Sequence, residues 1–187
     1  IYHDMSKKLH PLVLAADKMF RQAADADKAA PMAAYMKGKF LFYGIQSTER
    51  RGLSRLVLKQ QGIPPIAALP TILQDGFSLP HREMHYFVTE LAERYIKKAP
   101  ENFIEQVHFQ VVTHSWWDTV DLVATKQAGG LVKRFPSLIR YMDAWIGEKN
   151  IWLQRTAILH QLKYKKDTDE DRLLGYCLQC AESKEFF

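Results

Sequence analysis

The chain has 187 residues, of which 47% are hydrophobic and 25% are charged. This length predicts one domain, or at most two small ones, that can bury a core without disulfides or metals. The composition excludes a wholly disordered chain, and no apolar run is long enough to span a bilayer. The start of the chain is polar, unlike a signal peptide, and two cysteines are too few for a secreted disulfide scaffold. We therefore expect a cytoplasmic protein.

The net charge is concentrated in one stretch of the chain. Lysine and arginine number 26 against 21 aspartate and glutamate residues, which gives a formal net charge of +5. Between residues 37 and 59, Glu49 alone opposes a basic set made of Lys37, Lys39, Arg50, Arg51, Arg55 and Lys59. This basic segment therefore carries a charge equal to that of the whole chain. Such a stretch indicates a surface for a polyanion, and the alternative is a solvated helix face.

Helical patterns cover almost the whole chain. Several of them begin near a proline, where the missing N–H of that residue would be unpaired in any case. The apolar spacing predicts helices over residues 10–25, 30–40, 48–61, 65–74, 81–98, 101–113, 116–127, 137–147, 151–164 and 169–182. The pair Gly129-Gly130 predicts a turn between two of these helices.

The order of these elements predicts an all-α fold. No strand pattern or hairpin dipeptide stands out in the sequence, and glycine-rich phosphate loops are absent from it, which disfavours Rossmann and P-loop folds. Short helices with brief connections favour an α-solenoid or an irregular bundle. Trp116 and Trp152 are 36 residues apart, as are Phe87 and Val123, and repeats of helix pairs run about 34–47 residues. This period favours the solenoid.

Two patterns resemble metal or redox sites but lack the partners that such sites need. His81 and His85 share a face of a predicted helix, yet Arg82 stands where a zinc protease has glutamate, so we expect a surface pair. Cys177 and Cys180 form a C-x-x-C without a second pair, late in a helical pattern. We expect these cysteines on a buried helix face, and we expect no metal or cofactor in this protein.

A tryptophan and a carboxylate share one helix face in the segment from residue 115 to 121. Trp116, Val120 and Val123 follow the spacing of a core stripe, whereas Trp117 and Asp121 lie four residues apart on a face turned away from it. An aromatic wall beside a negative charge suits a flat, cationic ligand. The alternative is a half-buried tryptophan beside a solvated aspartate.

Arg155 is an isolated charge in a helix that is apolar nearly all round. Burying an arginine without a partner is costly, so its guanidinium should reach a carboxylate or an external anion. Arginine binds either group through two parallel hydrogen bonds. The structural alternative is an ion pair with Asp121 or Asp118.

Four segments of the chain resemble the bacterial DNA alkylation repair enzymes, which are alkylpurine DNA glycosylases built from HEAT-like helical repeats. The segments are residues 31–37, residues 42–46 with 49–51, residues 115–121 and residues 152–161. The resemblance is collinear and covers essentially the whole chain. It implies a curved, all-α solenoid with DNA on its concave, basic face, and excision of N3- and N7-alkylated purines from duplex DNA.

The resemblance also implies roles for individual residues. Tyr35 matches the tyrosine of the DNA cleft, Trp117 the aromatic wall, Asp121 the catalytic carboxylate and Arg155 the cleft arginine. Asp121 would stabilise the positive charge that develops on the sugar and orient the attacking water. The side chains expected at the DNA backbone are Lys37, Lys39, Arg50 and Arg51. His114 is expected at the DNA backbone or at the surface.

Residues 1–187 are expected to form a single HEAT-like repeat domain that acts as a monomer. It would lack the C-terminal helix pair of the family, with a further cleft tryptophan. Because the Trp117–Asp121 motif contains no lysine, the enzyme should be monofunctional, without a Schiff-base step. Two other functions stay open: a non-catalytic helical-repeat scaffold that senses damaged duplex, and a protein-binding adaptor, which the basic segment disfavours.

Overall fold

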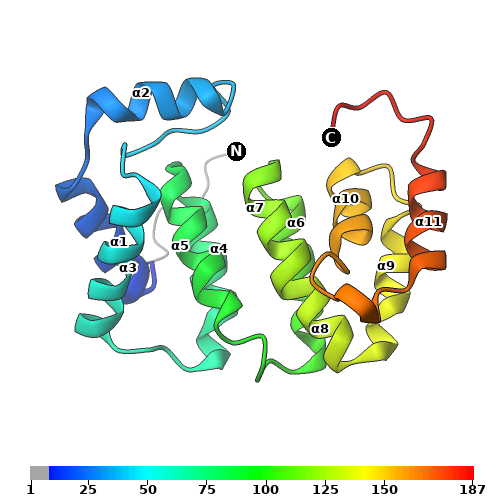
Figure 1. Ribbon diagram of the computed structural model, residues 1–187. Coiled ribbons are helices and arrows are strands. Elements are labelled where there is room, and N and C mark those ends of the chain that lie inside the picture. The colour runs from blue at the N-terminus through cyan, green and yellow to red at the C-terminus, as the bar shows by residue number, and fades with distance from the viewer. Residues whose placement is uncertain (1–8) are drawn as a thin grey trace, which may run out of the picture. The chain divides into compact units, whose positions relative to one another are not determined.

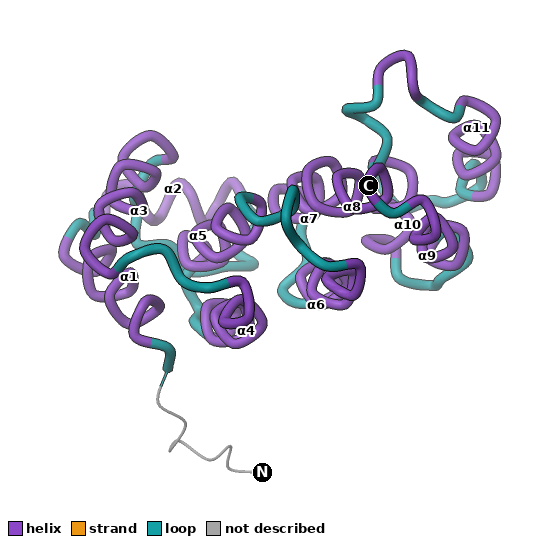
Figure 2. Tube along the Cα trace, turned by 90° about the horizontal axis from the view of Figure 1, so that it is seen from below, coloured by secondary structure: helices purple, strands orange, loops and turns teal. Residues whose placement is uncertain are grey.

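The computed structural model describes residues 9–187, and these residues form helices joined by short loops (Figure 1). No strand occurs among them, as Figure 2 shows, and their one β-type contact is an isolated bridge between Leu41 and His81. The all-α class is therefore confirmed for the described residues, while the solenoid stays a prediction. The chain divides into two compact units, one ending at Val88 and the other running from Thr89 to Phe187.

The first unit contains four helices and the first half of a fifth in its described part. They are α1 (Pro11–Gln22), α2 (Ala26–Tyr35), α3 (Ser47–Gln61), α4 (Leu69–Ser78), which the 3-10 turn η1 (Ile66–Ala68) precedes, and α5 (Arg82–Glu93). The buried apolar side chains of α1, α3, α4 and α5 form a core in which Phe20 packs edge-on against Phe87, with ring centroids 6.0 Å apart, whereas α2 contributes no buried residue. Apolar burial of this kind is the main force that holds short helices together.

The second unit is built in the same way from shorter elements. In chain order they are η2 (Glu101–Phe103), α6 (Ile104–Val112), α7 (Trp117–Leu122), η3 (Val123–Ala128), α8 (Gly129–Arg134), η4 (Pro136–Leu138), α9 (Ile139–Trp145), α10 (Ile151–Leu159), η5 (Lys165–Asp167) and α11 (Glu170–Gln179). Of these, η3 is a π-helical segment that joins α7 to α8 without a break.

Several predicted helix ends were wrong: the ends predicted at residues 40, 98 and 164 lie at Tyr35, Glu93 and Leu159. Two further errors have a clear physical cause. Helix α2 begins four residues before the predicted start at residue 30, because the carboxylate of Asp25 caps it by accepting the N–H groups of Asp27 and Lys28, and Pro31 lies inside the helix. Gly129-Gly130 forms no turn, since α8 begins at Gly129. A Cβ at Gly129 would lie 2.1 Å from the main-chain oxygen of His160, so this glycine serves close packing.

A buried carboxylate fixes the loop between α2 and α3. Glu83, which is fully buried at the start of α5, accepts the main-chain N–H groups of Tyr43, Gly44 and Ile45 at 3.1, 3.0 and 3.2 Å. Gly44 has a φ of +89°, and a Cβ there would lie 2.0 Å from the main-chain oxygen of Asp25. The loop therefore needs both the anion and the glycine, and it packs against the N-terminal end of α2, where the main-chain oxygen of Tyr43 accepts the N–H of Asp25 at 2.8 Å.

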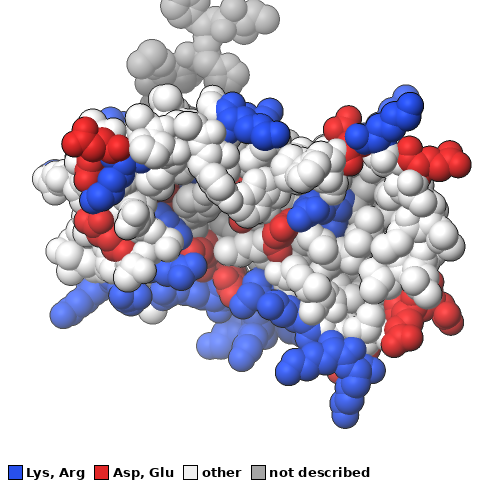
Figure 3. Space-filling model, turned by 45° about the horizontal axis from the view of Figure 1, so that its top comes forward, with Lys and Arg blue, Asp and Glu red and all other residues white. Residues whose placement is uncertain are grey.

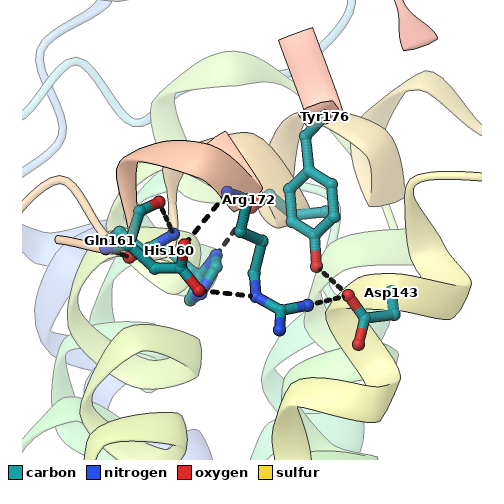
Figure 4. Close-up of polar contacts among 7 residues, drawn as sticks. Asp143, His160, Gln161, Arg172 and Tyr176 are labelled. Carbon is teal, nitrogen blue, oxygen red and sulfur yellow. Dashed lines mark hydrogen bonds and ion pairs between the residues drawn. The ribbon is translucent and has the colours of Figure 1, made fainter. Parts of the chain in front are cut away.

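A polar cluster ties α11 to α9 (Figure 4). The guanidinium of Arg172 forms ion pairs with Asp143 of α9 and with Asp169 at the start of its own helix. Tyr176 donates its hydroxyl hydrogen to Asp143 at 2.6 Å. Burial, reinforced by that hydrogen bond, raises the pKa of Tyr176 to about 12. This cluster anchors α11 to α9.

The surroundings of His85 and of the two cysteines differ from those that the sequence predicts. His85 is buried, not at the surface: its ring stacks on Phe77 with centroids 4.9 Å apart, and its Nε2 contacts the main-chain oxygen of Leu79 at 2.8 Å. Cys177 is exposed and Cys180 is partly exposed, so the expected buried cysteine face is also wrong. In α11 the buried position belongs to Tyr176, and the neighbouring Cys177 consequently points to solvent.

Within residues 9–187, no helix combines the length and the apolar character that crossing a membrane requires. The same residues contain no cluster of three or more His, Cys, Asp or Glu side chains that could hold a metal ion.

Candidate functional site

The helix that carries the tryptophan–aspartate pair has the predicted faces. Trp116, Val120 and Val123 are buried, whereas Trp117 and Asp121 are partly exposed. Helix α7 begins at Trp117, after Trp116 in extended conformation. The core stripe thus orients α7 so that its second face, with Trp117 and Asp121, reaches the rim of the second unit.

Asp121 and Arg155 form a two-point ion pair between α7 and α10. The Nε of Arg155 donates to one carboxylate oxygen at 2.6 Å, and Nη2 donates to the other at 2.8 Å. The Asp121 side chain is 35% exposed and that of Arg155 is 24% exposed, so solvent and ligands can reach the pair. Asp121 is therefore the carboxylate partner of Arg155, one of the two alternatives that the sequence offered. The parallel geometry fixes the orientation of the carboxylate.

An aromatic cluster lies at the N-terminal ends of the same two helices. Trp116 packs against Trp152 with ring centroids 5.6 Å apart, and the ring of Phe187 lies 4.9 Å from Trp116 and 5.4 Å from Trp152. Arg155 donates through Nη1 to the main-chain oxygen of Phe187 at 3.1 Å. Aromatic faces therefore border the ion pair, and they offer the quadrupoles that attract a cation.

Sequence reasoning missed two members of this cluster. Helical spacing assigned neither Trp152 nor Phe187 to the candidate site. The spacing of 36 residues between Trp116 and Trp152 was the available indication, since equivalent positions of stacked helix pairs lie side by side. Phe187 follows an irregular segment after α11, and no periodicity predicts where such a segment goes.

The other predicted DNA-contacting residues belong to the first unit. Tyr35 ends α2 and is 71% exposed. Lys37, Lys39 and Arg51 are exposed as well. Arg50 is different, because it is only 4% exposed. Its guanidinium lies 4.9 Å from the ring centroid of Tyr86.

Basic side chains are common at the surface, but Arg50 of the basic segment is not among the exposed ones. Lysine and arginine side chains are numerous on the face drawn in Figure 3, where several lie beside acidic ones. The burial of Arg50 shows that its charge is used inside the first unit, as a partner of an aromatic ring. That Tyr35 and the exposed cations share a cleft with Trp117 and Asp121 stays a prediction.

His114 lies in the connection between α6 and α7. It is exposed and has a φ of +48°, a left-handed conformation that is uncommon for a residue with a side chain. The neighbouring Ser115 donates its hydroxyl hydrogen to the main-chain oxygen of Val111 at 2.6 Å and so closes this sharp turn. The turn brings Trp117 to the start of α7.

Comparison of the chain with known proteins points to one family. A family model described as DNA alkylation repair enzyme matches residues 16–187. A solved structure described as a predicted DNA alkylation repair enzyme from Enterococcus faecalis is 30% identical to the chain, with a TM-score of 0.77. The match covers 87% of this chain and 76% of the other. No curated protein matches the chain.

Proposed function

The chain belongs to the DNA alkylation repair enzymes, and on that premise we propose that it hydrolyses the N-glycosidic bond of cationic N3- and N7-alkylated purines in duplex DNA. The observation that carries this proposal is the orientation of one partly exposed carboxylate, Asp121, by the two-point contact with Arg155 beside a tryptophan-lined rim. The protein would act as a monomer in the cytoplasm, through one curved HEAT-like repeat domain.

The chemistry needs little from the enzyme beyond fixed charge. Alkylation at N3 or N7 makes the purine cationic, so the base departs neutral when it takes the electron pair of the bond to C1′. The deoxyribose becomes an oxocarbenium ion, and water then attacks C1′. The carboxylate of Asp121 stabilises the positive sugar and orients that water, whose proton passes to the carboxylate or to solvent. Preorganised charge of this kind is often the largest single contribution to catalysis.

The remaining side chains hold the substrate. Trp117 gives the cationic nucleotide an aromatic face, an attraction of about 0.5–2 kcal/mol. Of the five N–H donors of Arg155, two contact Asp121 and one contacts Phe187, which leaves two for a DNA phosphate among the described contacts. Tyr35 would complete the cleft. Lys37, Lys39 and Arg51 would contact phosphates.

The absence of a lysine from the motif supports a monofunctional enzyme. Lys126, the next lysine after Asp121 in the chain, is paired with Glu93 at 3.2 Å. A Schiff-base step would require an amine that is free to attack C1′. We therefore propose hydrolysis that ends with an abasic site and an intact backbone.

The test is the Asp121→Asn variant. Its release of alkylated bases should fall by about 100- to 1,000-fold, because the charge that stabilises the sugar is lost. Its affinity for duplex should be equal or better, since a negative charge has been removed from the DNA side. Asp118→Asn is the matched control, with the same change of charge on the same helix, and it should release bases at nearly the wild-type rate.

The alternative function is a non-catalytic scaffold that senses damaged duplex. It is favoured by the fact that Arg155 engages both oxygens of Asp121, as a purely structural ion pair would. If the protein is a scaffold, Asp121→Asn will change DNA binding only slightly. No variant will alter base release, because the wild type itself will release no base. Undiminished base release by Asp121→Asn would instead assign the chemistry to another residue.

A further inference from the structure

The helix that carries Asp121 changes its winding immediately after this residue. Helix α7 ends at Leu122, the π-helical segment η3 occupies Val123–Ala128, and α8 continues the same rod from Gly129. A π-helical stretch places one more residue in a turn than an α-helix does, so it changes the angular relation between the residues before and after it. Such stretches are rare and occur frequently at functional sites.

The wide turn is held from one side by a buried amide network. Gln127 and Gln110 of α6 are both fully buried, and each donates to the other's carbonyl oxygen, at 2.8 and 3.1 Å. Gln127 also donates to the main-chain oxygen of Thr89 in α5 at 3.1 Å. Gln110 donates in addition to the main-chain oxygen of Gln106 at 3.0 Å. Apolar contacts tolerate rotation of a helix about its axis, but directional bonds in a dry core do not.

The same turn is connected directly to the backbone of Asp121. Thr125 donates its hydroxyl hydrogen to the main-chain oxygen of Asp121 at 2.7 Å. A side chain that bonds to the main-chain oxygen four residues before it competes with the regular ladder and bends or unwinds a helix. The hydroxyl of Thr125 therefore links the π-helical turn directly to the main chain of Asp121, whose carboxylate pairs with Arg155.

The rod that α7, η3 and α8 form together also packs against α10, the helix that carries Arg155. The Cα of Gly129 packs so closely against the main chain at His160 that any side chain there would collide with the carbonyl oxygen. The spacing between the rod and α10 is thus set by backbone contact, one residue after η3 ends. With the spacing fixed there, the rotation of the rod decides whether the Asp121 carboxylate meets the guanidinium in parallel.

We propose that η3 is a positioning device, in which Gln127, bound to Gln110 and Thr89, sets the rotation of α7 and thereby aims Asp121 at Arg155 and the substrate. Gln127 and Thr125 are positioning residues, because neither touches the reacting atoms. The catalytic consequence rests on the proposed glycosylase function, whereas the effect on the ion pair does not.

The first measurement uses the Gln110→Leu/Gln127→Leu variant. Replacing both amides leaves no buried amide without a partner, so the fold should be retained. Single-turnover release of 7-methylguanine should fall by about 100-fold, as expected when a reacting group moves by about 1 Å, while the dissociation constant for duplex stays within about twofold of wild type. Thr89→Val is the matched control: it removes a buried hydroxyl that has no partner but keeps the main-chain oxygen that Gln127 uses, and it should release base at the wild-type rate.

The second measurement does not depend on activity. Asp121→Ala, Arg155→Ala and the double variant give the coupling between the two side chains from urea unfolding, which should be about twofold to fivefold in the unfolding equilibrium constant. In the Gln110→Leu/Gln127→Leu background this coupling should vanish. An unchanged coupling would overturn the proposal. A coupling that vanishes, in a chain whose wild type releases no base, would uphold the positioning device and reject the glycosylase.

A substitution in the helix itself provides an independent variant if the double leucine chain does not fold. Thr125→Val removes the hydroxyl bond to Asp121 with little change of shape, and Thr125→Ser retains it. The valine variant should lose the coupling and the base release, and the serine variant should keep both. Equal behaviour of the two variants would contradict the proposal.

Discussion

At the scale of single residues, the central feature is a carboxylate that forms an ion pair and to which we assign, as a proposal, a second role in catalysis. Asp121 accepts two hydrogen bonds from Arg155, yet a carboxylate has about four lone-pair sites, so its outer lone pairs can still face a sugar or a water molecule. Its 35% exposure leaves room for that approach. The ion pair is therefore compatible with catalysis, and it supplies the fixed orientation that electrostatic stabilisation requires.

The sequence predicted part of this site and for a clear reason. Helical periodicity separates the faces of one helix, so it placed Trp116 in the core and Trp117 with Asp121 at the rim. It also named Asp121 as one possible partner of Arg155. Periodicity does not show which side chains of distant helices meet. The contact of Phe187 with Trp152 and the burial of Arg50 against Tyr86 therefore lay beyond it.

A buried histidine makes stability depend on pH. His160 is 1% exposed, its Nε2 is buried without a hydrogen-bond partner, and burial lowers its pKa from the ordinary 6.5. The unfolded chain therefore binds a proton that the folded chain refuses, and the stabilising contribution is complete above pH 6.5 and is lost as the pH falls through the folded pKa.

We expect the free energy of unfolding to decrease between pH 7.5 and pH 5, and His160→Gln to reduce that decrease. Urea unfolding at the two pH values measures both quantities. An equal pH dependence in wild type and variant would show that other groups cause the loss.

At the scale of elements, most helices follow from apolar spacing, and the errors have physical causes. The start of α2 was misplaced because proline is over-represented in the first turn of helices, whereas here the Asp25 cap lies six residues before Pro31. Gly129-Gly130 suggested a turn, but glycine also allows close approach of two backbones. The π-helical segment η3 contains Gln127, which bonds to residues distant in the sequence, and apolar spacing does not reveal such bonds.

The charge of the basic segment predicts how the affinity for duplex DNA depends on the salt concentration. If exposed lysine and arginine side chains neutralise phosphates, duplex affinity should fall steeply with salt, because bound cations are released from the DNA. Lys39→Gln with Arg51→Gln should make the slope of log K against log salt shallower by about one unit for each lost contact. Fluorescence anisotropy over a salt series measures this slope.

The matched control for that experiment removes two charges elsewhere. Lys97 and Lys98 are also exposed, lie outside the basic segment, and can be changed to glutamine together. Their replacement should leave the slope close to that of wild type. A slope that changes with the Lys97/Lys98 pair and not with the Lys39/Arg51 pair would move the DNA contacts to the second unit.

At the scale of the whole molecule, the excess positive charge and the proposed catalytic pair belong to different units. Residues 1–88 contain 12 basic and 7 acidic side chains, whereas residues 89–187 contain 14 of each. The excess positive charge thus lies in the first unit, and the Asp121–Arg155 pair lies in the neutral second unit. We expect the first unit to supply much of the affinity for the DNA backbone and the second to supply the selectivity for cationic bases.

The most direct test of the account is the identity of the bases that the purified protein releases. A fixed carboxylate beside aromatic faces suits lesions that already carry positive charge, whereas a neutral base needs a proton donor or a pocket that binds its edges. Chromatography of the products from methylated duplex and from uracil-containing duplex should show 7-methylguanine and 3-methyladenine but no uracil, and His114→Ala should not change this result. Efficient release of uracil by the wild type would contradict the account. A loss of that release in His114→Ala would show that general-acid chemistry operates at this site.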